Sequence, residues 1–273
     1  REEQVFLEPW HGTPLKRLAF DQEEVTAASP TYKAQFYRQK QEWDYLIAPN
    51  KFSSDIFKSC FMYDGNMLET GHPRNDLLSL PNRDAIALEL KKKLGIPLDK
   101  KTILYAPTWR VRNQFNMKID IQELKKQIQD DYVLMLRIHP FAVKGLKEDL
   151  LDEFVINVSN YPSVEELYLA SDIVITDYSS VMFDYAILNR PMLFFTYDLE
   201  DYRDTLRGFN FDFVAEAPGP LLKTSDEVIQ SIVNIDKVAQ EHDEALQKFR
   251  KKFCEYEKGT ASEQIFQRVM QNQ

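Results

Sequence analysis

A histidine held in a turn is the residue of this chain best suited to moving a proton. The segment WHGTPLK, residues 10–16, surrounds His11 with Gly, Thr and Pro, which turn the backbone after a short predicted strand. An imidazole, with an ordinary pKa of about 6.5, can accept a proton near neutral pH. His11 is therefore a candidate general base. A histidine that only caps a helix or hydrogen-bonds the backbone of the turn would give the same pattern.

Two further segments offer cations to a phosphate. RIHP, residues 137–140, ends a predicted strand, and Arg137 and His139 would point to the same side as residues i and i+2 of that strand. YAPTWR, residues 105–110, follows another strand and supplies a hydroxyl and a guanidinium, which can bind phosphate through two hydrogen bonds. A surface arginine, a capping histidine and a capping loop remain the alternatives.

Two serines begin a predicted helix that also contains Asp184. The free N–H groups of a first helical turn attract anions, so Ser179 and Ser180 could bind a phosphate there. Asp184 could accept hydrogen bonds from ribose hydroxyls. Ordinary capping explains the serines equally well, and Asp184 could be only an acid that favours the helix dipole.

Several kinds of site find no support in the sequence. It contains no pair of carboxylates, no Cys/His ligand set and no Gly-rich phosphate loop, and it has 8 glycines in total. We therefore predict no metal and no cofactor. We give no catalytic role to His72, in a predicted hinge, or to His242, in a charged terminal helix.

The residues that could carry chemistry fall directly after strands of an alternating α/β pattern, and ligands of such folds bind at the carboxyl ends of strands. We predict a GT-B-like α/β fold, with two Rossmann-like units that face a cleft. The first unit, 1–80, includes a hinge and is expected to be truncated at its start. The second, 81–240, binds the donor, and the C-terminal helix, 241–273, packs back across both.

The elements predicted from apolar periodicity are short and regular. The predicted strands are 4–7, 45–48, 67–70, 102–106, 132–138, 155–158, 173–176 and 192–195. The predicted helices between them are 31–42, 53–60, 84–94, 121–129, 164–170 and 181–188.

Composition excludes several classes of protein. The 273 residues carry 43 acidic and 34 basic side chains, and this net charge of −9 argues against a nucleic-acid partner. No apolar run approaches the roughly 20 residues of a membrane-spanning helix. Cys60 and Cys254 lie far apart without paired or metal-ligand spacing, which favours a reducing cytoplasm.

Five motifs in a fixed order resemble one known family. They are WHGTPLK (10–16), GHPRND (71–76), YAPTWR (105–110), RIHP (137–140) and SDIVITDYSSVMFDYAILNRP (171–191). Together they resemble the CDP-glycerol:poly(glycerophosphate) glycerophosphotransferase family of teichoic-acid polymerases and primases. The resemblance extends from Val5 to about Asp212, with a weaker match in KGTAS, residues 258–262.

The resemblance implies roles for single residues. His11 and His139 match the histidines that the family needs for activity, and Ser179, Ser180 and Asp184 match its donor contacts. We further expect the donor to be bound by Thr108, Arg110, Arg137, His139 and Pro140. We expect the acceptor or a phosphate to be oriented by Thr13, Lys16 and Arg74.

The resemblance also implies a reaction. A CDP-polyol donor, CDP-glycerol or CDP-ribitol, would give its polyol phosphate to the hydroxyl end of a lipid-linked polymer, and CMP would leave. We expect the chain at the inner face of the cell membrane, with at most peripheral contact through a segment missing here. The alternatives are a GT-B glycosyltransferase or nucleotide-sugar epimerase, and a nucleotide-binding module without catalysis.

Overall fold

Two parallel sheets organise the chain in the computed structural model, which describes residues 4–22, 31–108, 117–139, 148–201 and 208–271. In these ranges the smaller sheet has the order β1-β2-β3, and the larger one has the order β6-β5-β4-β7-β8-β9. The strands are β1 (Leu7–Glu8), β2 (Tyr45–Ala48), β3 (Asn66–Glu69), β4 (Lys101–Tyr105), β5 (Tyr132–Leu136), β6 (Val155–Asn157), β7 (Ile173–Thr176), β8 (Met192–Phe195) and β9 (Leu221–Leu222).

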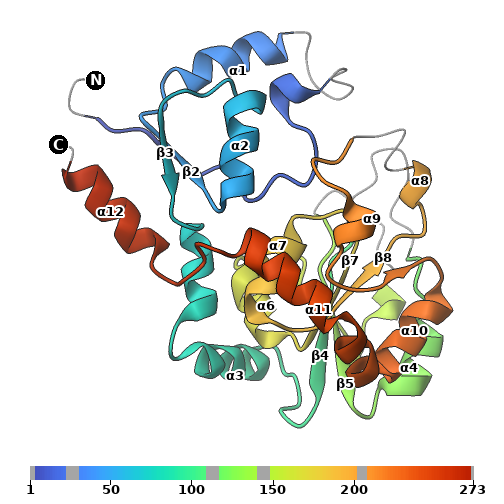
Figure 1. The fold of residues 1–273 in the computed structure, drawn as a ribbon. Coiled ribbons are helices and arrows are strands. Elements are labelled where there is room, and N and C mark those ends of the chain that lie inside the picture. Colours follow the sequence, from blue (N-terminus) through green and yellow to red (C-terminus); the bar gives the residue numbers. More distant parts are fainter. Residues whose placement is uncertain (1–3, 23–30, 109–116, 140–147, 202–207, 272–273) are drawn as a thin grey trace.

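Helices connect the strands and cover both sheets (Figure 1). The α-helices are α1 (Tyr32–Lys40), α2 (Lys51–Cys60), α3 (Arg83–Lys93), α4 (Ile121–Ile128), α6 (Val164–Ala170), α7 (Val181–Tyr185), α8 (Leu199–Asp201), α9 (Phe213–Glu216), α10 (Ser225–Val233), α11 (Ile235–Phe253) and α12 (Ala261–Gln271). The 3-10 helices are η1 (Ala19–Asp21), η2 (Pro73–Ser79), η3 (Glu148–Leu150) and η4 (Ala186–Leu188). The α/β class predicted from the sequence is confirmed.

Three predicted strands are confirmed at both ends. They are Tyr45–Ala48, Ile173–Thr176 and Met192–Phe195, and every residue in them is buried. Strands of parallel sheets are covered on both faces, so they appear in a sequence as short apolar runs between turn signals.

Other predicted limits are wrong, for local reasons. The strand expected at 4–7 forms at Leu7–Glu8, because these are the residues that pair with β2. The strand expected to reach residue 138 ends at Leu136, and the Ile138 N–H donates to Ser159 Oγ at 3.0 Å instead of to a strand. Strand alternation therefore does not set the directions of the Arg137 and His139 side chains.

The predicted helix 181–188 changes character in the middle. Its first part forms α7, and its second part tightens into η4. Asn189 then ends the element in the left-handed region, at a φ of 56°.

The larger sheet is buried on both faces. Leu104 and Phe194 point into one apolar core, which they share with α6, α7 and α11. Ile103 and Leu193 point to the opposite face and pack with α4 and α10. Neighbouring residues of a strand face opposite sides, so each strand supplies both cores.

The smaller sheet is also covered twice. Leu46 packs with Phe36 of α1 and Phe57 of α2. On the other face Ile47 packs with Ile265 of α12, which stands beside this sheet on the side away from α2 (Figure 1). The last helix of the chain thereby completes the first unit.

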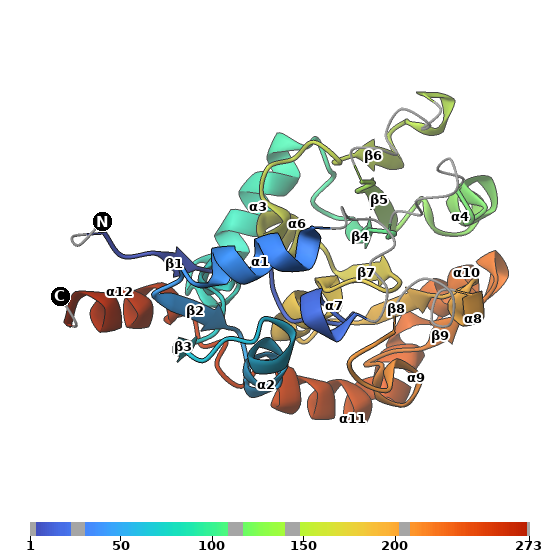
Figure 2. The same cartoon turned by 90° about the horizontal axis from the view of Figure 1, so that it is seen from above.

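The chain passes between the sheets at two places. It first runs through η2 into α3, which packs against α6 of the second unit. It returns after α11, and α11 and α12 follow one another along one side of the molecule when it is seen from above (Figure 2). We keep a domain boundary near residue 80 as a proposal, which the separation of the two sheets supports.

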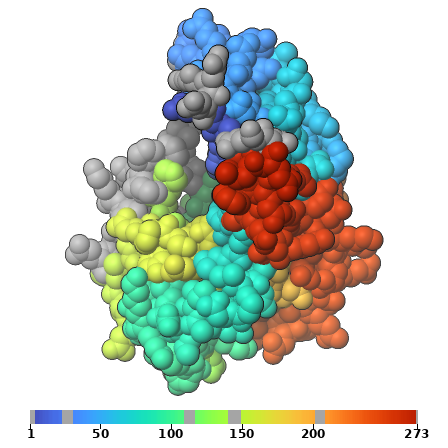
Figure 3. Space-filling model, turned by 90° about the vertical axis from the view of Figure 1, so that its left-hand side faces the viewer, coloured from blue at the N-terminus to red at the C-terminus, as the bar shows by residue number. Residues whose placement is uncertain are grey.

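Phenylalanines join the two units where α11 ends. The ring centroid of Phe253 lies 5.2 Å from that of Phe52 on α2 and 4.9 Å from that of Phe183 on α7. Aromatic pairs at these separations contribute beyond the apolar area that they bury. In the space-filling view the surface is hollowed between the first unit, in blue, and the yellow and green part of the second (Figure 3).

The described helices were also compared with the requirements of a bilayer. Not one of them, across the ranges given above, combines the length and apolar character needed to cross a membrane.

The hinge also fixes the start of α12, and this leads to a prediction. Asp76 accepts hydrogen bonds from the N–H groups of Ala261 and Ser262, each at 2.8 Å. The substitution Asp76→Ala leaves these N–H groups without their carboxylate, so the free energy of unfolding should fall by about 0.5–2 kcal/mol in urea titrations.

A matched control removes a cap elsewhere. Asp120 caps α4 by accepting from the Glu123 N–H at 2.9 Å. Asp120→Ala should cost a similar amount, but only Asp76→Ala should speed amide hydrogen exchange in α12. Equal exchange of α12 in both variants would contradict this role of Asp76.

Candidate functional site

The larger sheet brings several predicted site residues to one edge. Strands β5, β4 and β7 are neighbours in that order, and parallel strands end at the same edge of a sheet. The predicted residues that follow these strands are Arg137, His139, Thr108, Ser179 and Ser180. Two other residues predicted to bind the donor, Arg110 and Pro140, lie outside the described residues.

His11 lies in a loop of the first unit, and the predicted turn is confirmed. The indole of Trp10 stacks on the imidazole, with ring centroids 4.6 Å apart. Gly12 has a φ of 122°, and a Cβ at this position would lie 2.7 Å from Nη2 of Arg74. Glycine is therefore required here, because it alone adopts this backbone and lets the guanidinium approach.

Thr13 and Lys16 hold the rest of the loop. The buried Oγ1 of Thr13 accepts from Nδ2 of Asn50 at 2.8 Å. The same Asn50 amide donates to the carbonyl of Phe253 at 2.9 Å. Lys16 forms an isolated antiparallel bridge with Phe209 of the second unit. Contact of Thr13 and Lys16 with an acceptor or a phosphate stays a prediction.

Arg74 connects the loop of His11 with the second unit. Its Nη1 donates to the carbonyl of His11 at 3.1 Å, and its Nη2 donates to Oδ2 of Asp184 at 2.8 Å. Its Nε lies 3.5 Å from Oε1 of Glu165 on α6. These contacts give Arg74 a structural role beside its predicted role in orienting a substrate.

The surroundings of His11 favour its neutral form. Partial burial of the ring lowers the pKa of His11, and the positive charge of Arg74 lowers it further. A hydrogen bond to its own backbone opposes these effects. Since the residue is also exposed, solvent moderates the influence of Arg74. A neutral imidazole is the form that accepts a proton.

His72 supports the same loop from the hinge. Burial, followed by the charge of Arg74, lowers the pKa of His72 to about 4, so its ring is neutral at pH 7. Its Nε2 lies 3.4 Å from the carbonyl oxygen of Trp10. The sequence analysis gave His72 no catalytic role, and this contact places it behind the backbone that carries His11.

Asp184 is engaged by the hinge. It is 6% exposed, and while Oδ2 accepts from Arg74, Oδ1 accepts from Nδ2 of Asn75 at 2.9 Å. Both carboxylate oxygens thus have partners within the protein. The predicted contact of Asp184 with a donor ribose stays a prediction, and this geometry adds no support to it.

Glu257 belongs to the same cluster, and the sequence analysis missed it. Its Oε1 accepts from the His72 N–H and from Nδ2 of Asn75, both at 3.1 Å. The adjoining segment KGTAS, residues 258–262, with its weak family resemblance, was the nearest signal in the sequence.

Burial raises the pKa of Glu257 from 4.5 to about 8, so the native state favours its protonated form. Its contribution to stability is therefore complete below pH 4.5 and is lost as the pH rises through about 8.

Two charged residues at the sheet edge shape the loops around them. Asp177 accepts from the Thr108 N–H, with 2.9 Å to its Oδ1. Nη1 of Arg137 donates to the carbonyls of Val158 and Tyr161 at 3.3 and 2.9 Å. Burial lowers the pKa of Arg137. Its predicted phosphate contact stays a prediction, and the sequence gave no sign of these carbonyl partners.

The two serines differ in their contacts. The Val181 N–H donates to Oγ of Ser179 at 3.3 Å. Ser180 is the N-cap residue of α7, but its side chain makes no capping hydrogen bond. Simple capping therefore does not account for Ser180, and both residues are partly exposed at the strand edge.

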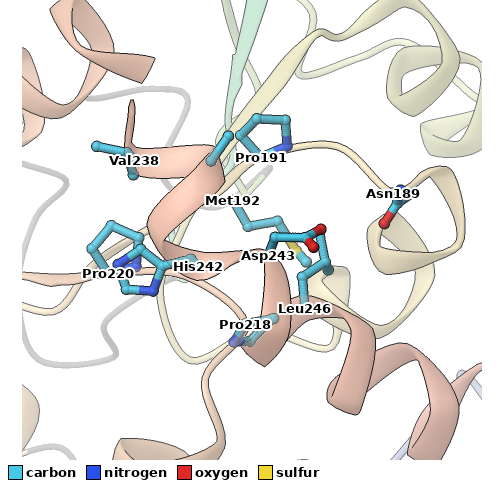
Figure 4. Close-up of a pocket in the computed structure, with 10 residues that line it drawn as sticks. Asn189, Pro191, Met192, Pro218, Pro220, Val238, His242, Asp243 and Leu246 are labelled. Atoms are coloured by element: carbon cyan, nitrogen blue, oxygen red, sulfur yellow. The ribbon is translucent and has the colours of Figure 1, made fainter. Parts of the chain in front are cut away.

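A pocket on the outer side of α11 lies apart from these residues (Figure 4). It has a volume of ≈ 80 Å³, and its lining includes Asn189, Pro191, Pro220, His242 and Asp243. Its lining contains no lysine or arginine, so it is poorly suited to a diphosphate. Among the described residues, no group of three or more His, Cys, Asp or Glu could hold a metal ion.

Comparisons with known proteins agree over nearly the whole chain. The profile of CDP-glycerol:poly(glycerophosphate) glycerophosphotransferases matches residues 1–271. A teichoic acid poly(glycerol phosphate) polymerase of Bacillus spizizenii is 44% identical over 97% of this chain, which spans 70% of that protein. One from Bacillus subtilis is 43% identical over 97% of this chain, which spans 37% of it.

Solved structures support the fold. The wall teichoic acid polymerase TagF has a TM-score of 0.92 and 42% identity, and the match covers all of this chain and 69% of that structure. A UDP-GlcNAc 2-epimerase of Neisseria meningitidis, at 20% identity, has a TM-score of 0.58 over 94% of this chain and 69% of its own. The second likeness concerns the fold alone, and the predicted GT-B-like architecture is confirmed.

The contact between Arg74 and His11 leads to a second prediction. Arg74→Met removes a positive charge that opposes protonation, so the pKa of His11 should rise toward its ordinary value. Arg74→Lys keeps a charge and should give a lower His11 pKa than Arg74→Met. The measurement is an NMR titration of the imidazole protons, with His11 assigned through His11→Asn.

Arg83→Met provides the control. Arg83 lies just after the same hinge, and its Nη1 donates to the carbonyl of Leu78 at 3.1 Å. This variant should leave the His11 titration unchanged. The interpretation fails if Arg74→Met and Arg83→Met titrate alike at His11.

Proposed function

The chain belongs to the CDP-glycerol:poly(glycerophosphate) glycerophosphotransferase family, and we propose that it transfers glycerol phosphate from CDP-glycerol to the end of a poly(glycerol phosphate) chain. The observation that carries the proposal is a neutral histidine loop tied across the hinge to the unit that bears the strand-end site. A base on one unit and a donor on the other suit a transfer between two bound substrates.

The proposed reaction is a displacement at phosphorus. A hydroxyl oxygen of the acceptor forms a bond to the phosphorus that carries glycerol. The bond from that phosphorus to the bridging oxygen breaks, and CMP leaves with this oxygen. The hydroxyl proton passes to the base, and catalysis consists mainly of positioning and charge stabilisation.

His11 is the proposed base. An alcohol holds its proton too tightly to lose it unaided near pH 7, and a positioned base contributes about 10²–10⁴-fold in rate. The lowered pKa of His11 keeps the ring ready to accept this proton. Thr13, Lys16 and Arg74 are proposed to orient the acceptor or a phosphate beside it.

The donor is proposed to bind at the edge of the larger sheet. Hydroxyl groups of Thr108, Ser179 and Ser180 can donate to the diphosphate oxygens, and His139 can stabilise the charge that develops there. These residues follow three neighbouring strands. The proposed donor residues further include Arg110, Arg137, Pro140 and Asp184.

The setting of the reaction is part of the proposal. A lipid-linked acceptor requires the chain to work close to a membrane, and a CDP-activated donor is a cytoplasmic compound. We therefore propose action at the inner face of the cell membrane, with peripheral contact at most.

A third prediction tests the base. His11→Ala should lower the turnover of CDP-glycerol by about 10²–10⁴-fold and remove the acidic limb of the pH–rate profile, because no imidazole then titrates in the reaction. CMP release with a glycerol-phosphate oligomer as acceptor measures the rate. Calorimetry should give nearly the same affinity for CDP-glycerol as the unchanged chain.

His242→Ala is the matched control, because His242 lines the pocket on α11. It should leave rate and pH profile unchanged. If His11→Ala instead abolishes donor binding while its residual rate keeps the original pH dependence, His11 is a phosphate ligand and the base lies elsewhere.

A fourth prediction tests the donor site. Replacing Ser179 and Ser180 together by alanine should weaken the binding of CDP-glycerol by about 1–3 kcal/mol, the usual loss for hydrogen bonds to a charged group. Calorimetry checks this, with Ser231→Ala on the exposed face of α10 as the control. Equal affinities of both variants would remove the start of α7 from the site.

A further inference from the structure

A second contact between the units lies on the other side of His11 from Arg74. Residues 14–17, which follow the His11 turn, run beside residues 208–210 of the second unit. The Arg17 N–H donates to the carbonyl of Gly208 at 3.0 Å, and the Asn210 N–H donates to the carbonyl of Leu15 at 2.9 Å. These backbone bonds flank the bridge between Lys16 and Phe209.

The side chain of Asn210 completes this contact. Its Nδ2 donates to the carbonyl of Pro14 and to the carbonyl of Lys16, each at 2.9 Å. A primary amide nitrogen carries two hydrogens, so one atom can serve both acceptors. A carboxylate of the same shape would place lone pairs against both carbonyl oxygens. The contact is therefore specific for the amide.

The two contacts bracket the proposed base along the chain. Arg74 holds the backbone at His11 and is anchored on Asp184. Asn210 holds the backbone at positions 14 and 16, three and five residues later. Thr13, between them, is held from the first unit by Asn50. The loop is thus fixed at both ends against the unit that bears the strand-end site.

We propose that Asn210 is a positioning residue, which fixes the place of His11 relative to the donor unit. This inference rests on the function proposed above. Asn210 itself does not touch the reacting atoms in this scheme; it acts through the backbone of the loop. A displacement of about 1 Å in a catalytic group can lower a rate by roughly 10²-fold, so one side-chain contact at this distance from His11 has a measurable effect.

The test compares Asn210→Asp with Asn234→Asp. Asn234 is the matched control, because its Nδ2 also donates to a backbone carbonyl, that of Gln230, but at the exposed end of α10. Asn210→Asp should lower kcat for CMP release by roughly 10–100-fold with the KM for CDP-glycerol within about twofold. Asn234→Asp should change neither constant.

A second measurement reads the loop without any reaction. The imidazole NMR signals of His11, assigned through His11→Asn, should shift or broaden in Asn210→Asp and not in Asn234→Asp. If the unchanged chain releases no CMP, the proposed function fails, while these signals still report whether Asn210 holds the loop.

Asn210→Ala keeps the test usable if the aspartate variant does not fold, since it removes the two bonds without adding charge. It should also lower kcat more than it changes KM. Unchanged kcat and His11 signals in both variants would overturn the proposal. So would a fall in kcat that only matches the fall in the folded fraction.

Discussion

The ion pair between Arg74 and Asp184 is the contact on which the arrangement of the site depends. Nη2 and Oδ2 are 2.8 Å apart, and the aspartate side chain is only 9% exposed. Loss of either partner would leave the other charge poorly compensated in a place with little water, which is far more costly than loss of a surface pair. The same guanidinium holds the carbonyl of His11, so the pair links the hinge, α7 and the proposed base.

Around this pair the two units are joined by contacts from distant parts of the chain. Asn50 reaches the carbonyl of Phe253 and the hydroxyl of Thr13, and Glu257 holds the hinge through Asn75. A transfer between two substrates requires a base and a donor site in fixed relative positions. Contacts that converge on the hinge and on the His11 loop meet this requirement, because each limits the movement of one unit against the other.

Several residues with chemical side chains serve the framework of the site. Asp177 shapes the loop after β4 by accepting from the Thr108 backbone, and Arg137 binds two backbone carbonyls beyond β5. Backbone polar groups in such loops need partners when they are buried. The loops that carry Thr108 and His139 therefore depend on charged neighbours whose types alone would suggest substrate contacts.

The sequence by itself determined the class of fold, several strands and the turn at His11, because these depend on neighbouring residues. The apolar runs at Ile173–Thr176 and Met192–Phe195 predict buried parallel strands, and Gly12 predicts the turn. Five motifs in order determined the family. Only the tertiary structure decided that Arg74 meets Asp184, 110 positions away, and that Asn210 meets Pro14, 196 positions away. Such partners follow from how whole elements pack, and no local pattern of residue types encodes that distance.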